Sequence, residues 1–168
     1  GFGSGCDGGM ADYFLVDNVR HLIPLGGLDP VGAAPLMCAG VTTYHAIRQG
    51  LPLLKPGSAA VVIGIGGLGH LAIQILKTLS SSTIIAVDRE EEKLRQALTL
   101  GAHHALAAGP DAAARIREIT GGLGANVVID LVGNDVTLGF GQSVLAQAGS
   151  LKIVGVGGGT LPVRFHEM

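Results

Sequence analysis

Residues 59–88 decide the fold of this chain, and they read AAVVIGIGGLGHLAIQILKTLSSSTIIAVD. Residues 59–65 are a short apolar run rich in β-branched side chains, which predicts a strand buried on both faces of a parallel sheet. After a glycine cluster, apolar side chains recur at helical spacing over residues 68–79. Residues 83–87 then predict a second strand, which ends in Asp88. The stretch therefore predicts one complete β-α-β unit.

The same alternation continues toward the C-terminus. The sequence predicts three further strands, at residues 103–106, 126–132 and 151–156, and three further helices, at residues 90–101, 111–122 and 136–147. Strict alternation of strands and helices favours right-handed crossovers and a doubly wound parallel sheet. The predicted fold class is therefore α/β, with five strands of a Rossmann-type sheet.

The first part of the chain does not follow this rhythm. After a glycine-rich loop, residues 11–16 predict a strand, and residues 30–49 predict a helical segment interrupted at Pro35 and Gly40. We therefore expect residues 1–35 to be a remnant of another domain. Residues 36–160 form the expected dinucleotide-binding domain, and residues 161–168 a truncated tail.

Composition excludes several classes of protein. Apolar residues make up 48% of the chain and charged residues 14%, which excludes an intrinsically disordered protein. A net charge of −2 lacks the basic surface expected of a nucleic-acid binder. Residues 56–76 carry no formal charge, but their five glycines and their change of period exclude a membrane span. Two cysteines, Cys6 and Cys38, are too few for a disulfide scaffold, so we expect a reducing, cytoplasmic location.

The glycine cluster matches the pattern G-x-G-x-x-G of dinucleotide-binding proteins. Gly64 permits the tight turn, Gly66 and Gly67 let the backbone approach a pyrophosphate, and Gly69 allows close contact between helix and sheet. The amides at the start of the helix would face the anion. An ordinary glycine turn is the alternative interpretation, but a strand, a helix and an acid in the expected places favour a cofactor site.

Asp88 is the expected ligand of the adenosine ribose. It lies 19 positions after Gly69, at the end of the second strand, where a carboxylate accepts hydrogen bonds from ribose hydroxyls. The same charge repels a 2′-phosphate, so the sequence predicts NAD rather than NADP. Arg89 favours NADP instead, because an arginine at this position can bind the 2′-phosphate. Lys93 is either a further ribose ligand or a solvated lysine.

The motifs in their order resemble those of the zinc-dependent medium-chain alcohol dehydrogenases, most of all the bacterial secondary-alcohol branch. The resemblance rests on five stretches and covers nearly the whole chain: residues 8–17 (GGMADYFLVD), 33–47 (AAPLMCAGVTTYHAI), 56–58 (PGS), 64–69 (GIGGLG) and 120–133 (TGGLGANVVIDLVG). It implies hydride transfer between a small alcohol or ketone and NAD, with the alcohol bound to a catalytic zinc ion that acts as a Lewis acid.

The resemblance also implies roles for single residues. Cys38 matches the third ligand of the catalytic zinc, although on its own it reads as a small buried apolar residue. Thr42 would lie beside the nicotinamide, Leu68 and Val132 along the cofactor groove, and the backbone of Val154 near the carboxamide.

The chain departs from the family pattern at both ends. The family's other zinc ligands, its proton relay and its sixth strand have no counterpart here. We therefore expect an internal fragment that binds NAD weakly and is catalytically inactive. The apolar edge strand at residues 151–156 should promote association, and the intact enzyme should be a homo-oligomer, a dimer or tetramer. Two alternatives stay open: a zinc-free quinone or enone reductase of the same superfamily, and a nucleotide-binding module without catalysis.

Overall fold

A computed structural model of the chain describes residue 3 and residues 5–162. The chain divides into two compact units, Gly1–Ala34 and Pro35–Met168. Of the expected truncated tail at residues 161–168, residues 163–168 lie outside the described residues.

The first unit contains little regular structure. Its helical elements are η1 (Val19–His21) and α1 (Pro30–Ala33), and the Asp29 side chain caps α1 by accepting a hydrogen bond from Gly32 N. The prediction of a strand at residues 11–16 is wrong, because no strand covers them in the structure. Two apolar side chains of this segment are largely exposed, Tyr13 by 94% and Leu15 by 88%.

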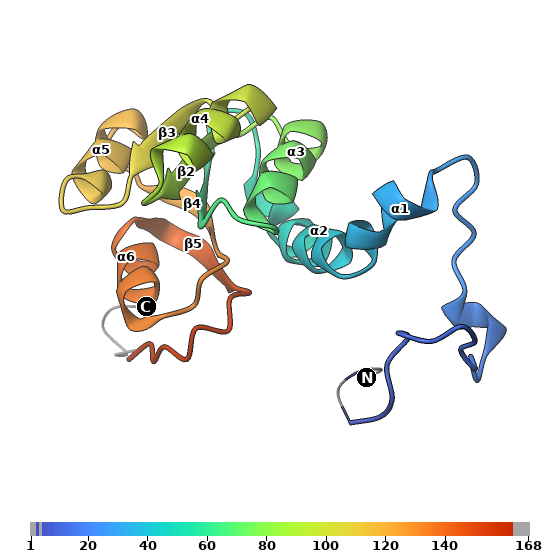
Figure 1. The fold of residues 1–168 in the computed structure, drawn as a ribbon. Helices are drawn as coiled ribbons and strands as arrows, with labels where there is room; N and C mark the ends of the chain where they lie inside the picture. The colour runs from blue at the N-terminus through green and yellow to red at the C-terminus, as the bar shows by residue number, and fades with distance from the viewer. Residues whose placement is uncertain (1–2, 4, 163–168) are drawn as a thin grey trace. The chain divides into compact units, whose positions relative to one another are not determined.

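The second unit is built on a five-stranded parallel sheet (Figure 1). Its strands are β1 (Ala59–Ile63), β2 (Thr83–Asp88), β3 (His104–Ala107), β4 (Ala125–Asp130) and β5 (Leu145–Ile153). The order across the sheet is β3-β2-β1-β4-β5, so the chain starts in the middle and builds outward in both directions. In the register, Ala60 lies between Ile84 and Val127. The predicted doubly wound parallel sheet is confirmed.

Helices cover both faces of this sheet. The helical elements of the second unit and its junction are η2 (Ala34–Met37), α2 (Ala39–Gly50), η3 (Leu51–Leu53), α3 (Gly69–Leu79), α4 (Glu91–Leu100), α5 (Ala112–Ile119) and α6 (Asp135–Ser143). Side chains of α2, α3 and α4 pack with one face of the central strands, and those of α5 and α6 pack with the other (Figure 1). Both faces of β1 are therefore buried, as its unbroken apolar sequence predicts.

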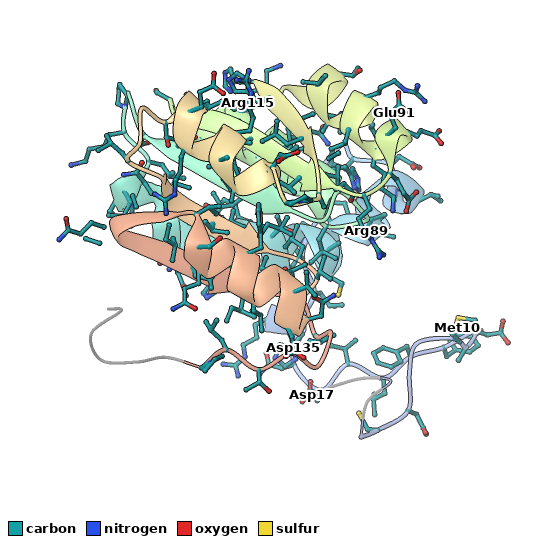
Figure 2. The ribbon with its side chains drawn as sticks, turned by 90° about the vertical axis from the view of Figure 1, so that its left-hand side faces the viewer. Met10, Asp17, Arg89, Glu91, Arg115 and Asp135 are labelled. Carbon is teal, nitrogen blue, oxygen red and sulfur yellow. The ribbon has the colours of Figure 1, made fainter. Side chains whose placement is uncertain are left out.

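Local sequence explains where these helices begin and end. The buried residues of α3 are Gly69, Ala72, Ile73 and Leu76, which share one face of the helix. α4 ends at Gly101, which takes the left-handed conformation with φ 116°. Charged side chains stand on the outer surfaces, as Glu91 on α4 and Arg115 on α5 show (Figure 2).

The helical segment predicted at residues 30–49 is interrupted around Pro35, as expected, because α1 ends at Ala33 and η2 covers Ala34–Met37, but the interruption predicted at Gly40 is wrong. α2 begins after Cys38, and Gly40 lies inside the helix. A side chain at Gly40 would place its Cβ 3.2 Å from the Cβ of Leu36, so glycine serves close packing here. The longest helix of the described chain is α2, with 12 residues, and none of the described helices is long and apolar enough to cross a membrane.

The C-terminal elements differ most from the prediction. The helix expected at residues 136–147 ends at Ser143, and the strand expected from residue 151 begins at Leu145. The pairing between β4 and β5 is irregular, because one residue of β4 lies opposite residues 146–149 of β5. Ala148 adopts φ 59° within this bulge. The bulge interrupts the strand pattern, which is why the sequence predicted a later start.

Candidate functional site

The turn between β1 and α3 contains two glycines at which a Cβ would clash with neighbouring atoms. Gly64 has φ +89°, and a Cβ on it would lie 2.7 Å from Cγ2 of Val132. A Cβ on Gly69 would overlap the carbonyl oxygen of Gly64. The first turn of α3 is therefore pressed against the end of β1, as predicted for a dinucleotide-binding turn.

Gly66 and Gly67 serve a different purpose. A Cβ at either position would meet nothing within 4 Å, so their backbone faces open space. Leu68 holds the N-cap position of α3 and makes no side-chain capping bond. The start of α3 therefore combines backbone donors, a helix dipole and room for a ligand, which together suit an anion.

Asp88 joins the end of β2 to this turn. Its Oδ2 accepts a hydrogen bond from Ile65 N at 2.6 Å, and its Oδ1 accepts one from Glu90 N at 3.0 Å. Partial burial opposes ionisation of Asp88, but hydrogen bonds from the backbone of Glu90, Ile65 and Arg89, with the charge of Lys93, outweigh it and lower the pKa. Each carboxylate oxygen keeps a lone pair for a ribose hydroxyl.

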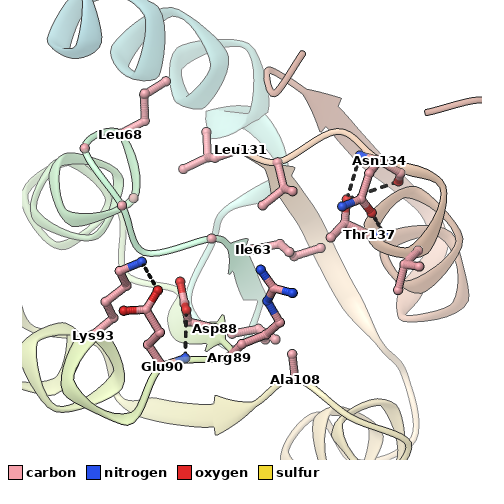
Figure 3. A pocket seen from close by; sticks show the side chains of 17 residues that line it. Ile63, Leu68, Asp88, Arg89, Glu90, Lys93, Ala108, Leu131, Asn134 and Thr137 are labelled. Carbon is pink, nitrogen blue, oxygen red and sulfur yellow. Dashed lines mark hydrogen bonds and ion pairs between the residues drawn. The ribbon is translucent and has the colours of Figure 1, made fainter. Parts of the chain in front are cut away.

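The rim beside Asp88 carries charges of both signs. Lys93 Nζ lies 2.6 Å from Oε1 of Glu90, and this hydrogen bond raises the pKa of Lys93. Figure 3 shows the Arg89 side chain extending from the end of β2 beside Asp88. Arg89 therefore adds a cation to the same pocket wall as Asp88.

The opposite wall of the site follows β4. Asn134 and Thr137 form a capping box at the start of α6: Oδ1 of Asn134 accepts from Thr137 N, and Oγ1 of Thr137 accepts from Asn134 N (Figure 3). Asp130 lies at the end of β4 and stabilises the turn between β4 and α6. Its Oδ1 accepts hydrogen bonds from Val132 N and Gly133 N in that turn.

Together these elements enclose a pocket of about 390 Å³ at the carboxyl ends of β1, β2 and β4. Nine of the predicted cofactor-binding residues line it: Gly64, Gly66, Gly67, Leu68, Gly69, Asp88, Arg89, Lys93 and Val132. The pocket lies where the strand order reverses, between β1 and β4, which is where open α/β sheets bind ligands.

Eight lining residues were not predicted from the sequence: Ile63, Val87, Glu90, Ala108, Leu131, Asn134, Val136 and Thr137. One signal was available, because Asn134 and Thr137 have the spacing of a capping box before an apolar helix. Ala108 carries no such signal. It reaches the pocket because the chain leaves β3 beside the end of β2, where Ala108 N donates to Asp88 O.

Three other predicted residues lie outside this lining. Thr42 is exposed on α2, and its N–H donates to Cys38 O. Val154 follows β5, and its N–H donates to Asp130 O. Cys38 is exposed at the N-cap of α2. Among the described residues, no three His, Cys, Asp or Glu side chains gather in a way that could hold a metal ion. The described residues therefore do not form a zinc site on their own.

The fold and the groove define a class: a Rossmann-type α/β protein of the kind that binds dinucleotides. Residues 67–168 match the family model described as zinc-binding dehydrogenase. The match covers more than half of the chain, so the chain belongs to this family.

Individual relatives agree with this assignment. The chain is 45% identical over 162 residues to an NAD-dependent alcohol dehydrogenase of Sulfurisphaera tokodaii, covering 95% of this chain and 46% of the relative. It is 43% identical over 159 residues to a D-arabinose 1-dehydrogenase (NADP(+)) of Saccharolobus solfataricus, covering 93% of this chain and 45% of the relative. The chain thus spans about half the length of the curated relatives it matches.

A solved structure supports the same conclusion. The D-arabinose dehydrogenase of Sulfolobus solfataricus superposes with a TM-score of 0.88 at 40% sequence identity, over 96% of this chain and 51% of that one. The likeness therefore extends to nearly all of this chain and to about half of the solved one.

Proposed function

We propose that this chain is the NAD-binding part of an alcohol dehydrogenase. The observation that carries the proposal is the placement of Asp88, whose carboxylate is held beside the glycine turn by Ile65 N. In this arrangement the pyrophosphate lies on the backbone of Gly66 and Gly67 and the first turn of α3, and the adenosine ribose binds Asp88. The nicotinamide half then extends toward β4, along Val132.

The function of these residues is to bind and orient the cofactor. The pyrophosphate is held by backbone donors, which need no reorganisation when the anion arrives. The apolar side chains of Leu68, Leu131 and Val132 line the groove and keep water away from the ring. When bound, NAD would supply hydride-transfer chemistry between an alcohol and the corresponding ketone or aldehyde, and these residues would hold it in place.

Zinc is part of the proposal only for the whole protein. When bound, a zinc ion supplies Lewis-acid chemistry at the alcohol oxygen. We propose that Cys38 contributes one thiolate ligand and that the other ligands come from outside this chain, because structural and catalytic zinc sites need three or four protein ligands. In the whole protein, Cys38→Ser should lower the zinc content measured by elemental analysis. Unchanged zinc would contradict this role.

The choice between NAD and NADP is the main alternative. An NADP-dependent D-arabinose dehydrogenase is among the relatives, and Arg89 is a cation able to meet a 2′-phosphate. Asp88 and Glu90 place two carboxylates on the same rim. Glu90 also accepts a hydrogen bond from the ammonium group of Lys93. We therefore propose NAD as the preferred cofactor, since both carboxylates repel the added phosphate.

Titration calorimetry with NAD and NADP tests the proposal on the 168-residue chain. We expect NAD to bind and NADP to bind more weakly. Tighter binding of NADP would overturn the proposed preference for NAD, and failure to bind either dinucleotide would reject the proposed function. The substrate class, a secondary or primary alcohol with the corresponding ketone or aldehyde, is tested by turnover of the whole protein.

A further inference from the structure

Asp130 is a buried acid that the proposed binding mode does not use. It ends β4, and its relative exposure is 0%. Its Oδ1 accepts hydrogen bonds from Val132 N at 2.9 Å and Gly133 N at 3.0 Å. Its Oδ2 is buried without a hydrogen-bond partner. A buried carboxylate oxygen without a hydrogen-bond partner lowers the stability of the fold, which suggests that Asp130 serves a function.

The backbone of Asp130 holds a second segment. Its carbonyl oxygen accepts hydrogen bonds from Val154 N at 2.9 Å and Gly155 N at 3.0 Å. A Cβ on Gly155 would overlap the backbone of Val132, so the two segments are in direct contact. One residue therefore fixes the turn after β4 through its side chain and the chain after β5 through its carbonyl.

Asp130 also lies close to the centre of the groove. In the sheet it pairs with Ile63, the residue that precedes the glycine turn. The turn it holds contributes Val132 and Asn134 to the pocket, while Asp130 itself lies behind that wall. With the adenosine ribose on Asp88 at the end of β2, the other half of the dinucleotide lies at the end of β4, on the far side of β1.

This placement puts a buried negative charge behind the nicotinamide half of the cofactor. The oxidised nicotinamide ring is cationic and the reduced ring is neutral. A carboxylate covered by protein acts through a medium of low dielectric constant, where its attraction for a cation is much stronger than in water. Backbone donors reach Oδ1 of Asp130, but none of the described groups donates to Oδ2.

We propose that Asp130 is a positioning residue whose charge makes this site bind NAD⁺ in preference to NADH. The inference rests on the proposed function and adds to it: the side chain holds the wall at Val132 and Gly133, and its field selects the oxidation state of the cofactor. The charge of Asp130 thus determines the ratio of the affinities for NAD⁺ and NADH.

The test compares two dissociation constants for the 168-residue chain, one for NAD⁺ by calorimetry and one for NADH by fluorescence. Asp130→Asn keeps the shape and the Oδ1 acceptor but removes the charge. We expect Kd for NAD⁺ to rise about tenfold relative to Kd for NADH. Val128→Ala, a buried substitution on the same strand and face, is the matched control, and it should change both constants by the same factor.

Equal changes for NAD⁺ and NADH in Asp130→Asn, or no change in either, would overturn the inference. Thermal melting shows whether each variant folds, and Asp130→Ser, which also removes the charge, gives the same comparison if Asp130→Asn does not fold. If the unaltered chain binds neither form of the dinucleotide, the proposed function fails and the inference fails with it. If it binds both and the ratio is insensitive to Asp130, only the inference fails.

Discussion

Glycines of the same motif have different reasons for being glycine. A Cβ at Gly69 would overlap Gly64 O, whereas a Cβ at Gly66 would meet nothing within 4 Å. Glycine at position 69 is therefore needed for the fold, whereas glycine at position 66 leaves space for the ligand.

Alanine substitutions at Gly69 and Gly66 test this difference between the two glycines. Gly69→Ala should lower the free energy of unfolding by about 1–3 kcal/mol, because the turn must shift to admit the methyl group. Gly66→Ala should change it by less than about 0.5 kcal/mol, yet weaken NAD binding by occupying the space proposed for the pyrophosphate. Urea unfolding and calorimetry measure the two effects. Equal destabilisation by both variants would contradict this division of roles.

Asp88 gives the fold a dependence on pH as well as a place for the ribose. Its pKa is lowered in the folded state, so its hydrogen bonds stabilise the fold above the unfolded pKa, near about pH 4, and that stability is lost as the pH falls through the folded pKa. Asp88→Asn should therefore be less stable than the unaltered chain at pH 7, and this difference should shrink toward pH 3.

The measurement is urea unfolding at both pH values, with NAD affinity at pH 7 as a second readout. Asparagine cannot accept at both Oδ positions, so the bond to Ile65 N or Glu90 N is lost and the affinity should fall. Glu91→Gln is a matched control, because Glu91 is an exposed acid in a surface pair with Arg95. A difference that stays constant with pH would argue against the assigned role of Asp88.

The helices differ in how their first turns are capped. Asn134 and Thr137 form a reciprocal capping box at α6, while Asp111 occupies the N-cap position of α5 without a side-chain capping bond. α6 also contains Gly139 and Gly141, which weaken a helix. The Cβ of residue 141 would lie 3.0 Å from Leu151 Cδ1, so glycine there allows α6 to approach β5.

We predict that Asn134→Ala destabilises the protein by about 1 kcal/mol, whereas Asp111→Ala has an effect below about 0.5 kcal/mol. Chemical denaturation of the two variants under the same conditions checks this. Because the capping box also shapes the pocket wall, the first variant should weaken NAD binding and the second should not. The reverse order of stabilities would contradict the capping assignment.

Some elements follow directly from local sequence, and others do not. β1, α3 and β2 lie within two residues of their predicted ends, because the apolar period changes sharply at Gly64 and again at Ser80. β5 was predicted six residues too late, because a bulge at residues 146–149 hides the alternation. Residues 11–16 have the pattern of a strand, but the structure assigns no strand to them.

The sheet has β5 at one edge, and apolar side chains at and just beyond the C-terminal end of this strand are exposed. Ile153 is 52% exposed, and Val156, just beyond the strand, is 97% exposed. We propose that this edge promotes self-association, since an unpaired strand edge is a template for another chain.

Sedimentation of the 168-residue chain over a range of concentrations tests this proposal. We expect association that increases with concentration and that Ile153→Lys reduces it, because a charge on an edge strand opposes edge pairing. Leu79→Lys, which changes an exposed apolar residue on α3, is the control and should have little effect. A monodisperse monomer at high concentration would reject the proposal.

The order of residues along the chain was enough to predict the β-α-β unit, the glycine turn and Asp88, because each depends on neighbours within about thirty positions. Folding was needed to bring Val132 against Gly64, and to place Asp130 between the turn after β4 and the chain after β5. Those contacts join segments far apart in the sequence, and no local period encodes which strands become neighbours. The side chain of Asp130 accepts its hydrogen bonds from Val132 N and Gly133 N, which are local in the sequence. Its carbonyl oxygen accepts from Val154 N and Gly155 N only once β4 and β5 lie side by side.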